Sequence, residues 1–219
     1  MSRTRLAVAT TAVVGVLWGT LTACGGDDVS SSGGSGGHKG TSGSHTPKSA
    51  PTVPDSATVL NEDQVKSALP DPGAMGGLEA VSAYVNTADG HLDCPSVQEC
   101  KGKWFGSAKY ALSGATHYAN FEITTYSSAQ DARDGMKREA GSNPALSKPT
   151  FGNESRAYTM SGGGLQGEYV TMRVGTVVAT TFVEGGASEP MLTQGARMFA
   201  ERITQIEAGH KATATLPQY

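Results

Sequence analysis

Cysteine is the residue type with the most distinctive chemistry in this chain, and its three copies fall in two different settings. Cys24 follows an uncharged, apolar run over residues 6–21, and Arg3 and Arg5 precede that run. A short basic segment followed by an apolar stretch of this length is typical of an export signal. We therefore expect the chain to be exported, with residues 1–23 as its signal peptide.

The tetrapeptide Leu21-Thr22-Ala23-Cys24, with two glycines after it, resembles the lipobox of bacterial lipoproteins. In that family the cysteine thiol is acylated, cleavage makes the cysteine the new N-terminus, and acyl chains such as palmitate hold it to the membrane. The resemblance implies lipidation of Cys24 and a location on the extracytoplasmic face of the cell membrane. Two alternatives stay open. Residues 6–26 carry no charge and could span a bilayer uncleaved, and a plain secretory signal could be cut near Ala23.

Cys94 and Cys100 form the second setting, a polar segment on the exported side of the membrane. Thiols at this spacing can close a small ring in an oxidising compartment, so we predict a disulfide between them. Two unpaired thiols, or a metal site with His91 and Asp93, are the alternatives. A single cysteine pair falls short of a zinc pattern, and the spacing is not the C-x-x-C of redox centres, so we expect no metal.

Acid–base residues are present but form no recognisable catalytic pattern. His117 and Glu122 fall on a predicted strand, and Glu168 and Glu184 lie at the ends of a predicted hairpin. A carboxylate facing solvent on a strand is ordinary, and no nucleophile with a neighbouring base stands out. We expect no catalytic residue and no cofactor.

Aromatic and cationic side chains are the better candidates for ligand binding. Trp104 and Phe105 follow the predicted disulfide, and Tyr169 and Arg173 share the more polar face of the predicted hairpin. We predict that these four residues bind a ligand. The alternative for the aromatic pair is a loop anchored into the core, and the alternative for the hairpin face is the second side of a sheet partly covered by loops.

The whole chain has 219 residues, a net charge of −3 and an isoelectric point near 5.9. No excess of positive charge is available to attract a phosphate backbone, so we expect no nucleic-acid partner. The length leaves room for one ordinary domain plus unstructured chain.

Residues 24–55 begin with the lipidated cysteine and continue as a predicted disordered tether rich in Gly, Ser and Pro. The segment has no aromatic residue, so it cannot bury enough surface to offset its ordering entropy. A flexible coil of this length reaches roughly 30 Å from its anchor. All seven Tyr and all five Phe follow it, which places the folded domain at residues 56–219.

The hairpin over residues 168–184 is the clearest local pattern, with a turn at Gly175-Thr176 where glycine suits a type II′ geometry. Its register places Val174 opposite Val177, Met172 opposite Ala179 and Tyr169 opposite Phe182. The other predicted elements are helix 62–69 after Asn61, strand 116–126, helix 129–140 after Ser127-Ser128, strand 156–161 and an amphipathic helix from Glu189. Residues 78–86 are predicted as a strand, with a short helix as the alternative. We expect the tail 211–219 to fray.

These elements predict an α+β fold, with an antiparallel sheet and helices packed on one of its faces in a single domain. Their order resembles the extracellular sensor domain of mycobacterial receptor Ser/Thr kinases, the PknH-like sensor family, over residues 59–208. The resemblance rests on the helix after Ser127-Ser128, the hairpin around Arg173-Val174-Gly175-Thr176-Val177-Val178 and the closing helix. It implies an extracytoplasmic sensor-like module.

The function that follows is a lipid-anchored, extracytoplasmic ligand-binding or sensor-like protein with a site in a groove between sheet and helices or loops. Its partners would be the membrane, through the N-terminal lipid, and a small molecule or an envelope protein. A cell-envelope hydrolase and a structural protein that docks to an envelope partner are the alternatives.

Overall fold

The computed structural model describes residues 52–89, 101–112, 117–162, 165–184 and 189–217, which belong to one unit, His45–Tyr219. The predicted signal peptide, Cys24, most of the predicted tether and the Cys94–Cys100 pair lie outside the described residues. Lipidation and the disulfide therefore stay predictions. Over the described ranges, no helix combines the length and apolar character needed to cross a bilayer.

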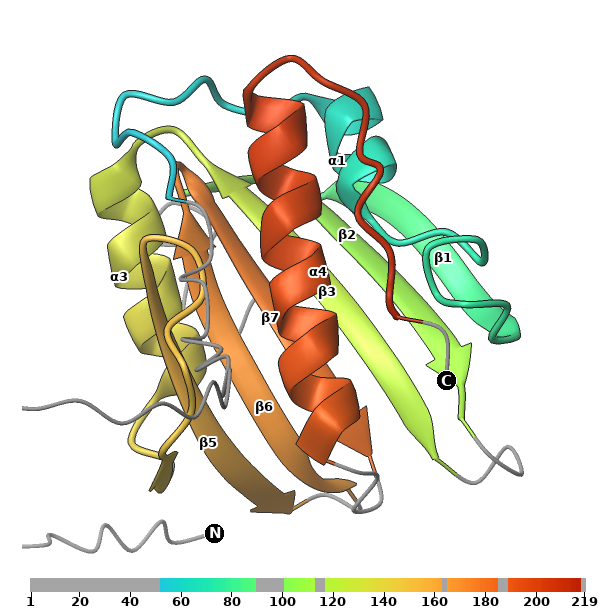
Figure 1. The fold of residues 1–219 in the computed structure, drawn as a ribbon. Coiled ribbons are helices and arrows are strands. Elements are labelled where there is room, and N and C mark those ends of the chain that lie inside the picture. The colour runs from blue at the N-terminus through green and yellow to red at the C-terminus, as the bar shows by residue number, and fades with distance from the viewer. Residues whose placement is uncertain (1–51, 90–100, 113–116, 163–164, 185–188, 218–219) are drawn as a thin grey trace, which may run out of the picture. The chain divides into compact units, whose positions relative to one another are not determined.

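A seven-stranded antiparallel sheet forms the centre of the domain (Figure 1). Its strands are β1 (Ala80–Thr87), β2 (Gly102–Ala111), β3 (Tyr118–Tyr126), β4 (Ala145–Leu146), β5 (Glu154–Gly162), β6 (Leu165–Val174) and β7 (Val177–Glu184). They lie in the order β1-β2-β3-β7-β6-β5-β4. The sheet thus brings β3, which precedes the hairpin by some distance in the chain, directly beside β7.

The hairpin of β6 and β7 has the predicted register. Val174 pairs with Val177, Met172 with Ala179, and Tyr169 with Phe182. Gly175 has a φ of 56°, a conformation that the turn requires and that side chains disfavour. The alternation along these strands predicts one apolar face and one mixed face, and this is confirmed. The side chains of the apolar face lie in the main core: Val170, Met172, Val174, Val177 and Ala179.

The described helices are α1 (Glu62–Ala68), α3 (Ala129–Ala140) and α4 (Glu189–Glu207). Asn61 caps α1 in a capping box with Gln64, and Ser128 caps α3 by accepting from the Asp131 amide. These caps satisfy backbone donors that would otherwise lack partners at the helix starts. The predicted helices and their N-terminal residues are confirmed at both places.

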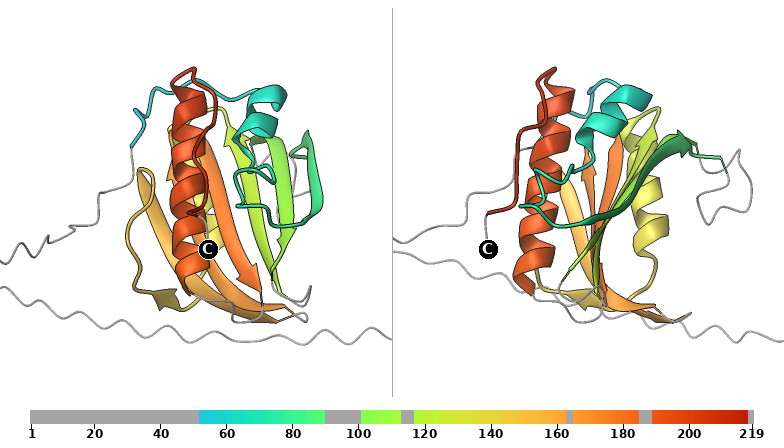
Figure 2. Two further views of the ribbon diagram at one scale, coloured as in Figure 1. Left: turned by 45° about the vertical axis from the view of Figure 1, so that its right-hand side comes forward. Right: turned by 90° about the vertical axis from the view of Figure 1, so that its right-hand side faces the viewer.

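The α+β fold class is confirmed, but the expectation that all helices pack on one face is wrong for α3. Figure 2 shows α1 and α4 on one side of the sheet and α3 on the other. The reason is a second apolar patch, in which Tyr126 and Val178 of the sheet bury against Ala132 of α3. Gly135 lets the helix approach closely, because a side chain there would collide with the Tyr126 ring.

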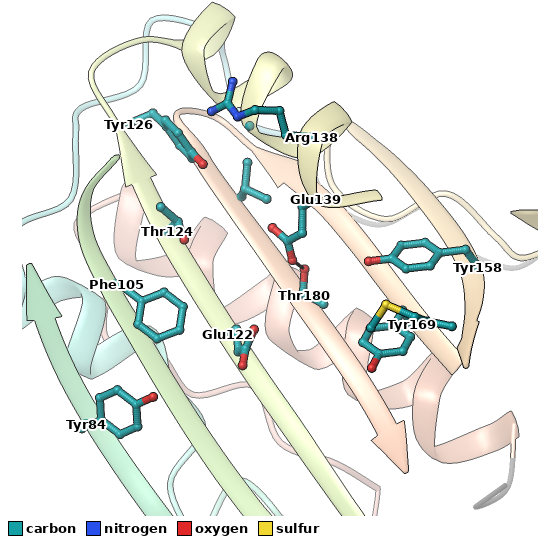
Figure 3. Close-up of a pocket in the computed structure, with 13 residues that line it drawn as sticks. Tyr84, Phe105, Glu122, Thr124, Tyr126, Arg138, Glu139, Tyr158, Tyr169 and Thr180 are labelled. Carbon is teal, nitrogen blue, oxygen red and sulfur yellow. Dashed lines mark hydrogen bonds between the residues drawn. The ribbon is translucent and has the colours of Figure 1, made fainter. Parts of the chain in front are cut away.

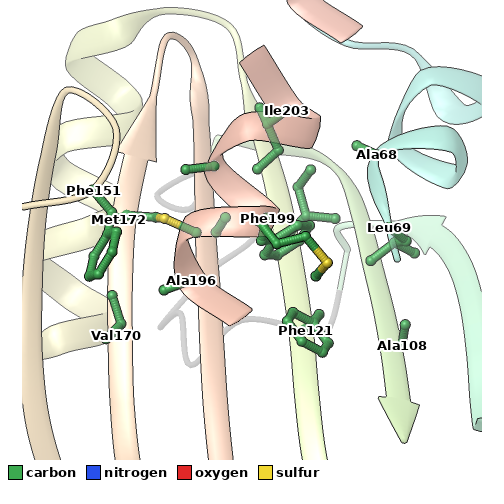
Figure 4. Packing of buried hydrophobic residues seen from close by; sticks show 14 of the residues in the cluster. Ala68, Leu69, Ala108, Phe121, Phe151, Val170, Met172, Ala196, Phe199 and Ile203 are labelled. Carbon is green, nitrogen blue, oxygen red and sulfur yellow. The ribbon is translucent and has the colours of Figure 1, made fainter. Parts of the chain in front are cut away.

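The main core lies between the sheet and α4, with α1 closing one end (Figure 4). Phe199 of α4 meets Phe121 of β3 edge to face, with ring centroids 5.5 Å apart. Met172, Ile203 and Leu192 are fully buried around them. Burial of this stripe explains why the amphipathic pattern from Glu189 onward is continuous over the whole helix.

Two features differ from the sequence-based expectations. Trp104 and Phe105 lie in strand β2 rather than in a loop, and Gly106 beside them leaves room for α1, since a Cβ there would lie 2.9 Å from Val65 Cγ1. The tail is also packed over its described part. Leu216 is buried, and its N–H donates to the Ala74 carbonyl at 2.7 Å.

Glu207, near the C-terminal end of α4, is a buried carboxylate beside the turn between β6 and β7. Neither of its oxygens has a hydrogen-bond partner of good geometry among the described residues. A Cβ at Gly175 would lie 2.5 Å from Glu207 Oε1, which is a second reason for glycine in the turn. Loss of solvation raises the pKa of Glu207 to about 8, although the Thr176 amide and Arg173 oppose the rise.

This raised pKa predicts that the domain loses stability as the pH rises. Glu207 binds its proton more tightly when folded, so its contribution is complete below pH 4.5 and is lost on approach to about pH 8. We expect Glu207→Gln to increase the free energy of unfolding at pH 8 by about 1–3 kcal/mol and to change it little at pH 4. Urea unfolding at both pH values measures this, with Glu201→Gln as the control on the same helix. Equal stabilities of wild type and Glu207→Gln at pH 8 would show that the carboxyl ionises without cost.

Candidate functional site

A pocket of about 450 Å³ opens on the face of the sheet that carries α3 (Figure 3). The sheet forms its floor, and the last turns of α3 form one wall. The residues that line it come from strands β1, β2, β3, β5, β6 and β7 and from α3: Tyr84, Phe105, Glu122, Thr124, Tyr126, Gly135, Arg138, Glu139, Tyr158, Met160, Tyr169, Val178 and Thr180.

Aromatic rings stand on both sides of Glu122 in this pocket (Figure 3). On one side, Tyr158 and Tyr169 stack with ring centroids 5.2 Å apart, and Phe182 continues the stack behind Tyr169 at 4.0 Å. On the other side, Tyr84 and Phe105 lie 6.1 Å apart at an angle of 47°. The register across neighbouring strands produces both groups. Tyr158, Tyr169 and Phe182 are directly paired across β5, β6 and β7, so they point to the same face of the sheet. Tyr84 pairs with Ser107 and Phe105 with Asn86, so Tyr84 and Phe105 are diagonal neighbours on that face.

A chain of hydroxyl groups crosses the strands to Glu139. The Tyr158 hydroxyl lies 3.0 Å from Thr171 Oγ1, which lies 2.9 Å from Thr180 Oγ1, and Thr180 donates to Glu139 Oε1. Glu139 is an exposed residue at the pocket wall, and its carboxylate lies against Thr180. Loss of solvation raises its pKa to about 7, with a further rise from Glu122 and an opposing effect of Thr180.

Glu122 supplies a second carboxylate, on the floor of the pocket in β3. Its side chain is exposed to the pocket, and within the described residues it forms no ion pair. The enclosing walls reduce its solvation and raise its pKa. The pocket therefore places two carboxylates that lack ionic partners among aromatic rings.

Of the four residues that the sequence predicted to bind a ligand, two line the pocket and two lie elsewhere. Phe105 and Tyr169 line the pocket. Trp104, the neighbour of Phe105 on the strand, points to the other face and packs against the main core. Arg173 is buried and forms ion pairs with Glu154 at 2.5 Å and with Asp55 at 2.8 Å, so it fastens the start of the domain to the sheet.

The four acid–base candidates also lie in different places. Only Glu122 lines the pocket. His117 Nδ1 is buried without a hydrogen-bond partner in the described structure. Glu184 pairs with Lys109 at 3.2 Å, and Glu168 pairs with Lys148 at 3.6 Å. No three His, Cys, Asp or Glu side chains of the described ranges gather closely enough to hold a metal ion.

Sequence reasoning did not identify Glu139, Arg138, Tyr84 or Tyr158 as site residues. The available signal was the mixed face of the hairpin, where Tyr169 and Phe182 share a face with Thr171 and Thr180. Extending that face to its neighbours required the strand order, because β3 and β5 flank the hairpin. The helix residues required knowledge that α3 covers this side.

Known proteins were compared with this chain by family, by sequence and by structure. No known family model matches this chain, and no curated protein matches it in sequence. Among solved structures, the chain is similar to the extracellular domain of PknH from Mycobacterium tuberculosis, with a TM-score of 0.48 and 11% sequence identity, over 68% of this chain and 98% of that one. The roles of the pocket residues rest on the geometry of this chain.

Proposed function

We propose that this chain is a lipid-anchored protein of the cell envelope whose domain binds a small ligand in the pocket beneath α3. The observation that carries the proposal is the pocket itself, a concavity with aromatic sides and two carboxylates. Its volume of about 450 Å³ lies within the range of small-molecule sites, and its few polar groups converge on one space.

A ligand in this pocket would contact two parts of the domain at once. Glu139 and Arg138 belong to α3, whereas Glu122 and Phe105 belong to the sheet. Binding would therefore tie the helix to the sheet and reduce the freedom of α3. Such a change is a direct means of reporting occupancy to a partner, which suits a sensor-like module.

A cell-envelope hydrolase is the second candidate, and the two carboxylates are the observation in its favour. Glu139, with a pKa of about 7, has a proton to donate near neutral pH, and Glu122 shares the pocket. Paired carboxylates of this kind act as acid and base in glycoside hydrolysis. We place ligand binding before hydrolysis because the aromatic rings that line the pocket provide contacts for a ligand whether or not a reaction takes place there.

Thermal unfolding of the full chain with fractionated envelope extract tests the proposal. A ligand that binds the folded state raises the melting temperature, so we expect at least one fraction to shift wild type by several degrees. Tyr84→Ala removes a pocket wall and should abolish the shift. Val81→Ala is the matched control, because Val81 is a residue of β1 outside the pocket that is exposed to 52%, against 43% for Tyr84. An equal shift in both variants would place binding elsewhere.

A further inference from the structure

We propose that the ligand of this pocket is an organic cation, an amine or quaternary ammonium group attached to an apolar or aromatic body. This inference rests on the proposed binding function and gives it a chemical class. It is carried by the charges, hydroxyl chain and aromatic rings that meet in the pocket.

The charge balance of the pocket favours a cation. Glu122 and Glu139 provide two carboxylates, whereas Arg138 is the one cationic side chain among the described lining residues. Figure 3 shows the Arg138 guanidinium beside Tyr126 at the end of the pocket away from Glu122. Lys109 lies on the same sheet face but pairs with Glu184 at 3.2 Å. The space between Glu122 and Glu139 therefore has uncompensated negative charge.

The hydroxyl chain holds Glu139 ready to accept a cation. An ionised carboxylate only accepts hydrogen bonds, so Thr180 must donate to it. Thr171 is then free to donate to Thr180, and Tyr158 to Thr171, at 2.9 and 3.0 Å. With Glu139 ionised, all three hydroxyl groups therefore donate in the direction of Glu139. They stabilise its ionised form through one oxygen and leave Glu139 Oε2 for a ligand.

The aromatic rings also favour binding of an organic cation. A cation within about 6 Å of a ring face is attracted by the electrons of the ring, and the apolar body of the ligand gains contact with the same surface. Tyr84 and Phe105 offer such a surface beside Glu122. An anion would be repelled by both carboxylates, and a neutral apolar molecule would strip water from them without compensation.

Binding of a cation should also depend on pH near neutrality. A bound cation favours ionised Glu139, whose pKa of about 7 means that part of the population must first release a proton. The other titratable groups around it are Glu122, Arg138 and the pocket tyrosines Tyr84, Tyr126, Tyr158 and Tyr169. Burial raises the pKa values of Tyr126 and Tyr158 to about 12, so they keep their protons in this range.

The test is a titration of the full chain, followed by NMR chemical shifts, with three probes of similar size and different charge. They are 2-phenylethylamine, 2-phenylethanol and 3-phenylpropanoate. We expect the amine to bind at least tenfold more tightly than the alcohol at pH 8, and the carboxylate not to bind. The affinity for the amine should fall several-fold at pH 6, whereas that for the alcohol should not change.

Variants separate the carboxylates from the rest of the pocket. Glu139→Gln and Glu122→Gln should each lower the affinity for the amine about tenfold and leave the alcohol unaffected. Glu79→Gln, which changes an exposed carboxylate outside the pocket, is the control and should behave as wild type. Two independent variants keep the test valid if one of them fails to fold.

The outcomes distinguish this inference from the function on which it rests. Equal binding of amine and alcohol in the pocket would overturn the cation preference and leave the binding function intact. Failure of all three probes would also overturn the cation preference. If the protein isolated from its own host then carried no ligand either, the binding function would fall as well.

Discussion

Replacement of Cys24 by Ala is expected to abolish incorporation of labelled fatty acid into the protein completely. The expectation follows from the proposed lipid anchor, since the thiol of Cys24 is the atom that acylation requires. The variant should either leave the membrane fraction or accumulate as an uncleaved precursor. Metabolic labelling followed by fractionation measures both results.

The other cysteines provide the control for this experiment. Cys94→Ala removes a thiol outside the proposed lipobox and should keep full labelling and membrane association. Undiminished labelling of Cys24→Ala would contradict the anchor. Loss of labelling in both variants would indicate that the cysteine changes act through folding instead.

Replacement of Arg202 by Ala is expected to cause a large loss of stability of the domain. The guanidinium of this buried α4 residue donates to the carbonyls of Ser67, Ala68 and Leu69 at 3.2, 3.1 and 3.0 Å. It also donates to the Ala214 carbonyl at 3.1 Å. Backbone carbonyls at the end of a helix lack partners within the helix, so Arg202 serves as the C-terminal cap of α1 and as the clamp of the tail.

The expected cost is about 3–5 kcal/mol, because the change leaves several buried carbonyls unsatisfied and removes the partner of Asp71 at 3.3 Å. Urea unfolding measures it. Arg202→Lys keeps the charge but not the planar set of donors, so it should recover less than half of the loss. Arg197→Ala, on the same helix, should change stability by less than about 0.5 kcal/mol. A loss of under 1 kcal/mol in Arg202→Ala would contradict the proposed clamp.

Local sequence patterns account for most of the elements. Alternation and Gly175 determine the β6–β7 hairpin and its register, and Asn61 and Ser128 mark the starts of their helices. β2 was not predicted because Gly102–Ala111 lacks a clear alternation. Gly106, which makes the strand pattern weak, is needed there for the contact with α1.

Contacts between distant parts of the chain explain the other differences between the sequence predictions and the structure. Nothing in the sequence joins Asp55 to Arg173, yet that ion pair makes Arg173 part of the framework rather than of the pocket. Tyr84, Glu122 and Glu139 become neighbours only through the sheet order and the crossing of α3 to the second face. Fold class and the general place of a groove are therefore predictable from local patterns, whereas the site residues depend on topology.

Native mass spectrometry of the full chain, purified from its own host without added ligand, tests the binding function most directly. The account predicts a reproducible mass excess on wild type and on Val81→Ala that is reduced or lost on Tyr84→Ala. The excess mass also gives the ligand, which the cation proposal expects to contain an amine or quaternary ammonium group. Bare protein in all three samples, together with no thermal shift from any envelope fraction, would contradict a ligand-binding role for this pocket.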